Sequence, residues 1–312
     1  MSALNLLRAV VLIGLLLPFA HLSARAATLP GQGRVTSTAI ICAFEPERAA
    51  LVKRIKGAAT RHLDGMEFVT GRLGSQPVVL MTSGVSMVNA AMNTQLAIDH
   101  FRISRIVFSG IAGGLDPALG IGDVAVPERW SEALEVVMAR DTPEGFRVPP
   151  WMDGLEQLPS YGMMTPRAVH VGSRHRPPEF LHDFSVDVEL LALARRSVAD
   201  LPLRRCASAE HCLDRQPHVS IGGAGVSGPA FIDNAGYRDY LAHTWHASVV
   251  DMESAAVAQV AYHNEVPFLI FRSVSDLAGG DGQPNQMAVF MDLAAENSAA
   301  VVEAFVRALP RP

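Results

Sequence analysis

Two short apolar runs, separated by a stretch with helical spacing, constrain this chain more than any other feature. The runs are residues 247–250 and 268–271, and residues 254–263 between them carry alanines and valines at helical spacing. Asn264 and Pro267 then form a stop signal for the helix. Continuous apolar runs of this length are typical of strands buried on both faces of a parallel sheet. The pattern therefore predicts a β-α-β unit in an α/β fold.

Carboxylates follow both runs. Asp251 and Glu253 come directly after the first run, and Asp276 follows the second. Because ligands in open α/β sheets bind beyond the carboxyl ends of the strands, these acids are candidates for a site. Taken alone, Glu253 or Asp276 has a second explanation. Acids are favoured at helix N-termini, so either residue is also compatible with stabilising the following helix without any role in a site.

The first half of the chain adds a third acid and several small residues. Residues 38–43 predict a first strand, which leads directly to Glu47. Further strands are predicted at 78–81 and 106–108, and each is followed by a turn rich in small residues, at 82–85 and 109–115. Small residues and glycines let backbone amides approach a bound ligand closely.

Six motifs in this order resemble the nucleoside phosphorylase superfamily, and within it the 5'-methylthioadenosine/S-adenosylhomocysteine nucleosidases. They are AFEPE at 43–47, SGV at 83–85, GIAGGL at 110–115 with GD at 122–123, SGPAFI at 227–232, DME at 251–253 and SD at 275–276. The resemblance covers residues 38–309. It implies a single-domain phosphorylase/hydrolase-like α/β fold, with a mixed central β-sheet flanked by helices, and a homodimer without a cofactor.

The resemblance also implies catalytic roles. Asp276 is expected to be the general acid that protonates N7 of the purine, a step that typically contributes about 10²- to 10⁴-fold. Glu253 is expected to bind the ribose hydroxyls and to stabilise the oxocarbenium-like sugar. Glu47, assisted by Arg272, is expected to position the attacking water.

Substrate-binding roles follow in the same way. Met252 is expected to pack against the sugar, Phe231 to stack on the base, and the backbone of Ile232 to read the edge of the base. The resemblance also assigns the floor of the site to small residues, for which simple turn chemistry is the alternative. These are Ser83, Gly113 and Ser275, with the neighbouring glycines.

Hydrolysis is favoured over phosphorolysis. A phosphate dianion requires cationic and amide donors, usually with at least one arginine. Related phosphorylases have an arginine where this chain has Phe108. Arg272 alone is insufficient to bind a phosphate dianion. Glu47 would repel phosphate. A phosphate-dependent purine nucleoside phosphorylase remains the alternative, and a non-catalytic nucleoside-binding or storage protein is an alternative of another class.

Several features depart from the family pattern. Pro229 replaces a common acid, and Ile111 replaces a small polar residue. The segment 128–186 is longer than in compact nucleosidases, and its 149–151 and 174–178 stretches predict loops. Loops over a strand-end site often act as lids, so this segment is expected to influence the 5' specificity.

One competing pattern is G-x-G-x-x-G at 223–228, the fingerprint of a dinucleotide-dependent oxidoreductase. Pro229 follows its last glycine at once. The next helix is predicted to begin near Asp233 rather than within the glycine turn. A lone fingerprint of this kind is weak evidence.

The N-terminus resembles a secretory signal. Arg8 precedes an apolar run at 9–20, and Ala-Arg-Ala at 24–26 matches a cleavage site. We therefore expect residues 1–26 to be removed, 27–37 to be a linker, and the protein to be periplasmic or secreted, without stable membrane insertion; an uncleaved anchor is the alternative. Loss of Arg8 and Arg25 takes the net charge from −5 to about −7, which disfavours nucleic acid as a partner.

The three cysteines predict one disulfide. Cys206 and Cys212 lie in a polar connection and are spaced to close a small loop, whereas Cys42 belongs to a predicted buried strand and is expected to be an inert thiol. The histidines form no tight ligand cluster, so no metal site is expected.

Overall fold

The computed structural model describes residues 35–152 and 158–310. The predicted signal segment 1–26 and most of the predicted linker lie outside the described residues, so both stay predictions. Within these two ranges, no helix combines the length and the apolar character that crossing a membrane requires.

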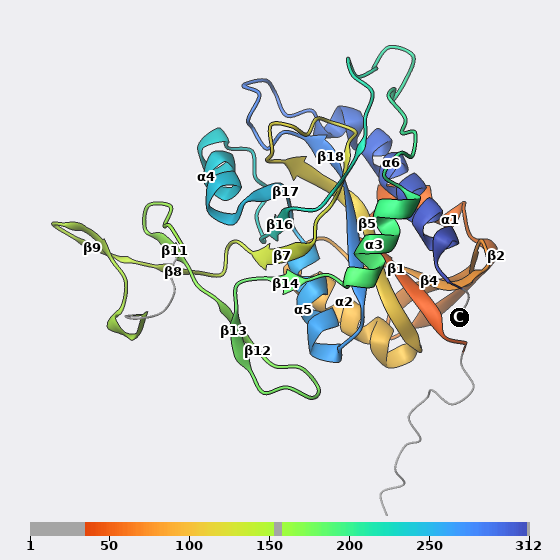
Figure 1. The fold of residues 1–312 in the computed structure, drawn as a ribbon, viewed down its shortest axis with the longest axis horizontal. Coiled ribbons are helices and arrows are strands. Elements are labelled where there is room, and N and C mark those ends of the chain that lie inside the picture. Colours follow the sequence, from red (N-terminus) through yellow and green to blue (C-terminus); the bar gives the residue numbers. More distant parts are fainter. Residues whose placement is uncertain (1–34, 153–157, 311–312) are drawn as a thin grey trace, which may run out of the picture.

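A twelve-stranded mixed sheet forms the centre of the molecule (Figure 1). Its main path runs β14-β7-β16-β17-β5-β1-β4-β3-β2, while β18 pairs with β5 and β6, and β15 pairs with β6. The strands are β1 (Ser37–Cys42), β2 (Lys56–Leu63), β3 (Met66–Leu73), β4 (Gln76–Thr82), β5 (Ile103–Gly114), β6 (Val124–Val126), β7 (Arg129–Glu132), β14 (Phe184–Ser185), β15 (Val219–Ile221), β16 (Ala224–Ser227), β17 (Ala247–Asp251) and β18 (Phe268–Asp276).

Helices cover the sheet in two groups. In one group, α6 packs on β5 and β18, with α1 and α3 beside it; in the other, α2 packs on α5, which contacts β7, β14 and β16. The helix α4 contacts β16 and β17. The helices are α1 (Glu45–Val52), α2 (Met87–His100), α3 (Val188–Ser197), α4 (Ala235–Trp245), α5 (Ser254–Asn264) and α6 (Met287–Ala308). The predicted α/β fold with a mixed central sheet flanked by helices is confirmed.

Hydropathy explains which strands lie in the centre. All residues of β1 and β18 are buried, as expected of apolar runs covered on both sides. By contrast, β2 at the sheet edge is polar and exposed over seven of its eight residues. A charged, exposed edge strand also resists pairing with a second chain.

The predicted β-α-β unit is only partly correct. Strands at 247–251 and 268–276 flank α5, as expected, but they do not pair with each other. β18 is parallel to β5, whereas β17 is parallel to β16 and antiparallel to the last residues of β5. The long β5 therefore contacts both strands at different points along its length.

The predicted glycine turn after residue 108 is wrong. β5 continues through this segment to Gly114, and Ser275 and Asp276 likewise belong to β18 rather than to a following turn. Gly110 is required not for a turn but because the side chains of Arg272 and Glu47 pass close to its Cα. A Cβ there would lie 2.0 Å from Nη1 of Arg272 and 2.6 Å from Oε1 of Glu47.

The segment between β7 and β14, residues 133–183, is termed the excursion, and its hairpins extend away from the sheet (Figure 1). Tyr161 contacts Tyr237 and Tyr240 of α4, with ring centroids 5.0 and 5.1 Å apart. Part of the predicted loop at 149–151 is a 3-10 helix. The elements are β8 (Val136–Met138), β9 (Arg140–Thr142), β10 (Gly145–Arg147), η1 (Pro150–Met152), β11 (Met164–Pro166), β12 (Val169–Val171) and β13 (Glu179–Leu181).

The G-x-G-x-x-G match does not form a dinucleotide fingerprint. Gly225 and its neighbours belong to β16, and the next helix begins at Ala235. A Cβ on Gly225 would lie 2.5 Å from the Trp130 ring, so this glycine serves packing.

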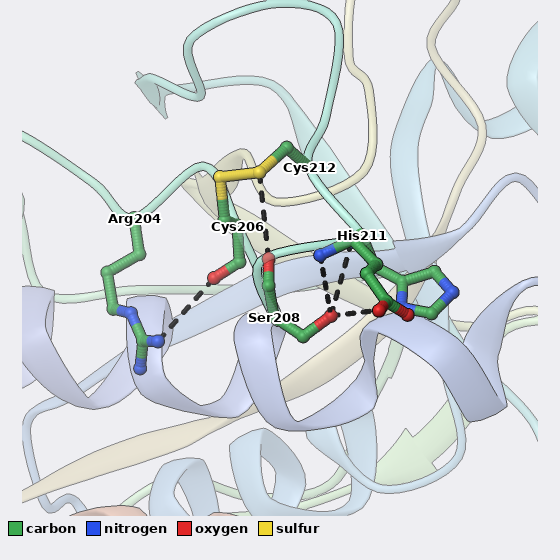
Figure 2. Close-up of a disulfide and its surroundings, with 6 residues drawn as sticks. Arg204, Cys206, Ser208, His211 and Cys212 are labelled. Carbon is green, nitrogen blue, oxygen red and sulfur yellow. Dashed lines mark hydrogen bonds between the residues drawn. A yellow bond between two sulfur atoms is a disulfide. The ribbon is translucent and has the colours of Figure 1, made fainter.

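The predicted disulfide is confirmed. Cys206 and Cys212 are joined across a short loop beside a helix (Figure 2). Cys42 is a buried free thiol whose pKa burial raises well above its ordinary value. It is therefore protonated and inert at neutral pH.

Candidate active site

A pocket of about 230 Å³ opens where β1, β5, β17 and β18 end. Most of the predicted site residues line it: Glu47, Gly113, Phe231, Ile232, Met252, Glu253, Ser275 and Asp276. Ser83 and Arg272 do not. The remaining lining residues are Ala43, Phe44, Val85, Ile111, Ala112, Ala230, Val250, Asp251 and Met287.

Arg272 lies beneath the pocket floor and is fully buried. Its Nε lies 2.6 Å from Oδ2 of Asp251, its Nη2 3.5 Å from Oε2 of Glu253, and its Nη1 3.8 Å from Oε1 of Glu47. The guanidinium also stacks over the Phe108 ring at 4.1 Å. Arg272 was predicted to assist Glu47, and it contacts this carboxylate and two others from below the pocket.

Glu47 is held by the backbone of two neighbouring strands. The N–H of Ala43 donates to Oε2 at 2.6 Å, and the N–H of Ile111 donates to Oε1 at 2.8 Å. Burial raises the pKa of this carboxyl, and the charge of Arg272 and these N–H donors oppose the shift only in part. A carboxylate with a raised pKa is a stronger base towards water.

Glu253 is hydrogen-bonded to a strained backbone. The N–H of Ser86 donates to Oε1 at 2.8 Å, and Ser86 has φ of +81°, a region that non-glycine residues rarely adopt. Burial raises the pKa of Glu253 to about 7, with Asp251 adding to the shift and Arg272 opposing it. Its charge therefore changes near neutral pH.

Asp251 was a candidate by its position at a strand end, but the sequence assigned it no role. Its Oδ1 accepts from the Ser227 hydroxyl at 2.5 Å and from the N–H groups of Glu253 and Ser254, both at 3.1 Å. Its Oδ2 contacts Arg272. Asp251 thus connects the start of α5 to the guanidinium. The only sign of this role in the sequence was that Asp251 directly follows a predicted strand, shortly before Ser254.

Asp276 is buried at the end of β18. The N–H of Ala278 donates to Oδ1 at 2.9 Å, and the Ser275 hydroxyl donates to Oδ2 at 2.9 Å. Ala278 has φ of +50°, so the backbone is bent into a sparsely populated region to place that N–H.

The walls that would contact a ligand are largely apolar. Phe231 is 52% exposed at the pocket, which leaves a ring face free for stacking. Phe44, Val85 and Met287 also line the pocket. Phe44 and Val85 lie in two of the quoted motifs but were assigned no role, and Met287 lies outside all of the motifs. Ser83 is fully buried, and its hydroxyl donates to the Gly84 carbonyl.

No lysine or arginine lines this pocket, and among residues 35–152 and 158–310 no three His, Cys, Asp or Glu residues are grouped to hold a metal ion. None of the described residues of the excursion lines the pocket. The expectation that this segment influences the 5' specificity therefore stays a prediction.

Known proteins resemble the chain over most of its length. Residues 37–307 match the model of the phosphorylase superfamily. A 5'-methylthioadenosine/S-adenosylhomocysteine nucleosidase of Staphylococcus saprophyticus is 30% identical over 271 residues, which are 86% of this chain and 99% of that protein.

Solved structures share the fold. The Neisseria meningitidis 5'-methylthioadenosine/S-adenosylhomocysteine nucleosidase, in complex with methylthio-immucillin-A, superposes with a TM-score of 0.64 at 25% identity and covers 88% of this chain and 100% of its own. The futalosine hydrolase of Helicobacter pylori has a TM-score of 0.65 at 22% identity, with 88% and 99% covered.

Proposed function

Because the chain belongs to the phosphorylase superfamily, we propose that it hydrolyses the N-glycosidic bond of purine nucleosides. We propose 5'-methylthioadenosine and S-adenosylhomocysteine as the substrates. Adenine and the corresponding thioribose are then the products. The observation that carries this proposal is the set of four carboxylates around a pocket whose neighbouring arginine is fully buried and engaged.

The roles of the side chains follow from their surroundings. Asp276 delivers a proton to N7 of the purine, so that the base leaves as a neutral molecule. Glu253 holds the ribose hydroxyls and stabilises the positive charge that develops on the sugar. Glu47, whose pKa is raised by burial, accepts a proton from the attacking water.

Two features support hydrolysis over phosphorolysis. Arg272 is fully buried among carboxylates, so it offers no free donor to a phosphate. Glu47 and Glu253 line the pocket and would repel a dianion. Water is the nucleophile that this lining tolerates.

The apolar wall supports a thioether at the 5' position, which both proposed substrates carry. Phe44, Val85 and Met287 present hydrocarbon and sulfur surface against which the thioether can pack. Burial of a methylthio group there is favourable by about 1 kcal/mol or more.

We further propose a homodimer. Val85, Val88 and Met92 are exposed around the start of α2, with Val88 78% exposed, and Val85 also lines the pocket. A second copy of the chain on this face would bury the three side chains and narrow the pocket mouth. Sedimentation of the purified protein at micromolar concentration tests this, with a monomer as the contrary result.

We also propose that the protein is exported, because residues 1–26 resemble a secretory signal. The intact mass of the protein recovered from outside the cytoplasm checks this proposal. A mass that includes residues 1–26 would contradict cleavage.

The decisive experiment measures base release with and without phosphate. The substrates are 5'-methylthioadenosine, S-adenosylhomocysteine, adenosine and inosine. We expect adenine from the two thio-nucleosides at the same rate in both buffers. Strict dependence on phosphate would make the protein a phosphorylase. Saturable binding without release from any substrate would identify a non-catalytic binding protein.

A further inference from the structure

Asn285 lies in the loop between β18 and α6, just outside the pocket lining, and uses both ends of its amide. Its Nδ2 donates to Oδ1 of Asp276 at 3.3 Å and to Oδ1 of Asp233 at 3.1 Å. Its Oδ1 accepts from the N–H of Met287 at 2.9 Å. One side chain therefore connects the candidate acid, the loop that carries Phe231, and a residue of the pocket wall.

The two oxygens of Asp276 are not equivalent. Oδ1 accepts from two N–H groups, those of Ala278 and Asn285, and an N–H can only donate. Oδ2 faces the Ser275 hydroxyl at 2.9 Å, which can either donate or accept. Ser275 Oγ also lies 3.3 Å from the Ala112 carbonyl, so its hydrogen has a second acceptor when Oδ2 carries a proton.

The loop of Asn285 is packed against the loop of Phe231. The N–H of Asn234 donates to the Ala278 carbonyl at 3.1 Å, and a Cβ on Gly279 would lie 2.7 Å from the Asn234 nitrogen. The contact from Asn285 to Asp233 adds a side-chain link between the same two loops. These contacts link the loop that follows Asp276 to the loop that carries Phe231.

We propose that Asn285 is a positioning residue for proton transfer: it keeps Oδ1 of Asp276 as an acceptor, so that the transferable proton resides on Oδ2. This inference rests on the proposed function. In the reaction the proton passes from Oδ2 to N7 as the electron pair of the C1'–N9 bond moves to the purine. Water adds to C1' and gives its proton to Glu47.

The test compares Asn285→Ala with Gln286→Ala, a neighbour in the same loop whose side chain makes no hydrogen bond in the described structure. Each variant is assayed on 5'-methylthioadenosine and on a nitrophenyl riboside, whose leaving group departs without protonation. For Asn285→Ala we expect kcat on the purine substrate to fall about 10- to 100-fold, because small displacements of a catalytic group cost this much. The nitrophenyl riboside should be cleaved within about threefold of the wild-type rate.

The outcomes separate the inference from the function. If the wild-type protein releases no base, the proposed function fails. If the wild-type protein is active and Asn285→Ala lowers kcat equally on both substrates, or lowers it on neither, the positioning role is overturned. A purine-specific loss with an unchanged KM, absent in Gln286→Ala, supports it.

Discussion

Two buried carboxylate sites in this protein differ in how many carboxylates share one cation. At the pocket, Glu47, Asp251 and Glu253 share the guanidinium of Arg272, and burial raises the pKa of two of them. Just before β6, Asp123 is equally buried but is a single carboxylate among several donors.

The donors around Asp123 are numerous for one carboxylate. Both Nη atoms of Arg215 bond to it, the N–H groups of Gly120 and His218 each donate at 2.8 Å, and His218 Nδ1 lies 3.0 Å away. Burial of a carboxylate alone therefore does not mark a reactive site. The sharing of one cation by three buried carboxylates does, because it stabilises each charged form less well.

The largest effect should come from Arg272→Met. Three buried carboxylates would lose their shared cation, and breaking a buried pair typically costs about 3 to 5 kcal/mol. Chemical denaturation should show a loss of this size, and base release should vanish. The matched control is Arg215→Met, whose side chain is 46% exposed and should cost less. Equal losses of unfolding free energy in the two variants would contradict the difference drawn between the Arg272 and Asp123 sites.

Glu47→Gln should affect chemistry and spare the fold. The amide cannot accept a proton from water, so kcat should fall about 10²- to 10⁴-fold. Unfolding free energy should stay the same or rise, because burial disfavours the charge that is removed. Glu45→Gln, on the same helix and 70% exposed, is the control and should change neither quantity. An active Glu47→Gln would remove Glu47 from the reaction.

The pH dependence of stability should sharpen the contrast. The pKa of Glu253 is raised to about 7, so the folded state holds a proton there that the unfolded state releases near pH 4.5. The stabilising contribution of this group is complete below pH 4.5 and is lost as pH rises towards 7. Denaturation at pH 5 and pH 8 measures it, and Glu253→Gln should flatten the slope. If Glu253→Gln leaves the dependence of unfolding free energy on pH unchanged, that dependence arises from another group.

Asp123→Asn should lower stability and leave catalysis intact. We expect about 2 kcal/mol of lost unfolding free energy, since the amide accepts less well from charged donors while the partly exposed Arg215 regains water. The rate of base release per folded molecule should stay within about threefold of wild type. A larger loss of rate would mean that this cluster supports the reaction directly.

The smallest effect should come from removing the disulfide. Replacing both Cys206 and Cys212 by serine opens a short loop, for which chain entropy predicts about 2 kcal/mol or less. Activity should persist. A thiol count on the unreduced, denatured protein should find Cys42 alone, and three thiols would contradict the bridge.

The sequence was sufficient to predict the strands around α5 and the acids that line the pocket. Runs of buried apolar residues and acids at strand ends are local signals, so Glu47, Glu253 and Asp276 were found without the fold.

Other parts of the site depend on contacts that no local pattern encodes. In the sequence, Gly110 is equally compatible with a turn and with a strand position that a neighbouring side chain approaches closely. The structure decides for the second, because Arg272 occupies the space that a Cβ would need. The same holds for Asn285 and Met287, which lie in or after a loop and meet the pocket through tertiary packing. The direction of β17 relative to β5 also needed the structure.

The length of β5 has a consequence for how the chain folds. This one strand pairs with β1, β17 and β18, and the last two follow it by more than a hundred residues. Such non-local pairings slow folding, because loop closure must precede the contacts that reward it. Until β18 arrives, one edge of β5 has unpaired backbone groups in an apolar strand, which is a template for aggregation. A chain that folds only after it is complete therefore depends on protection of this edge during synthesis or transport.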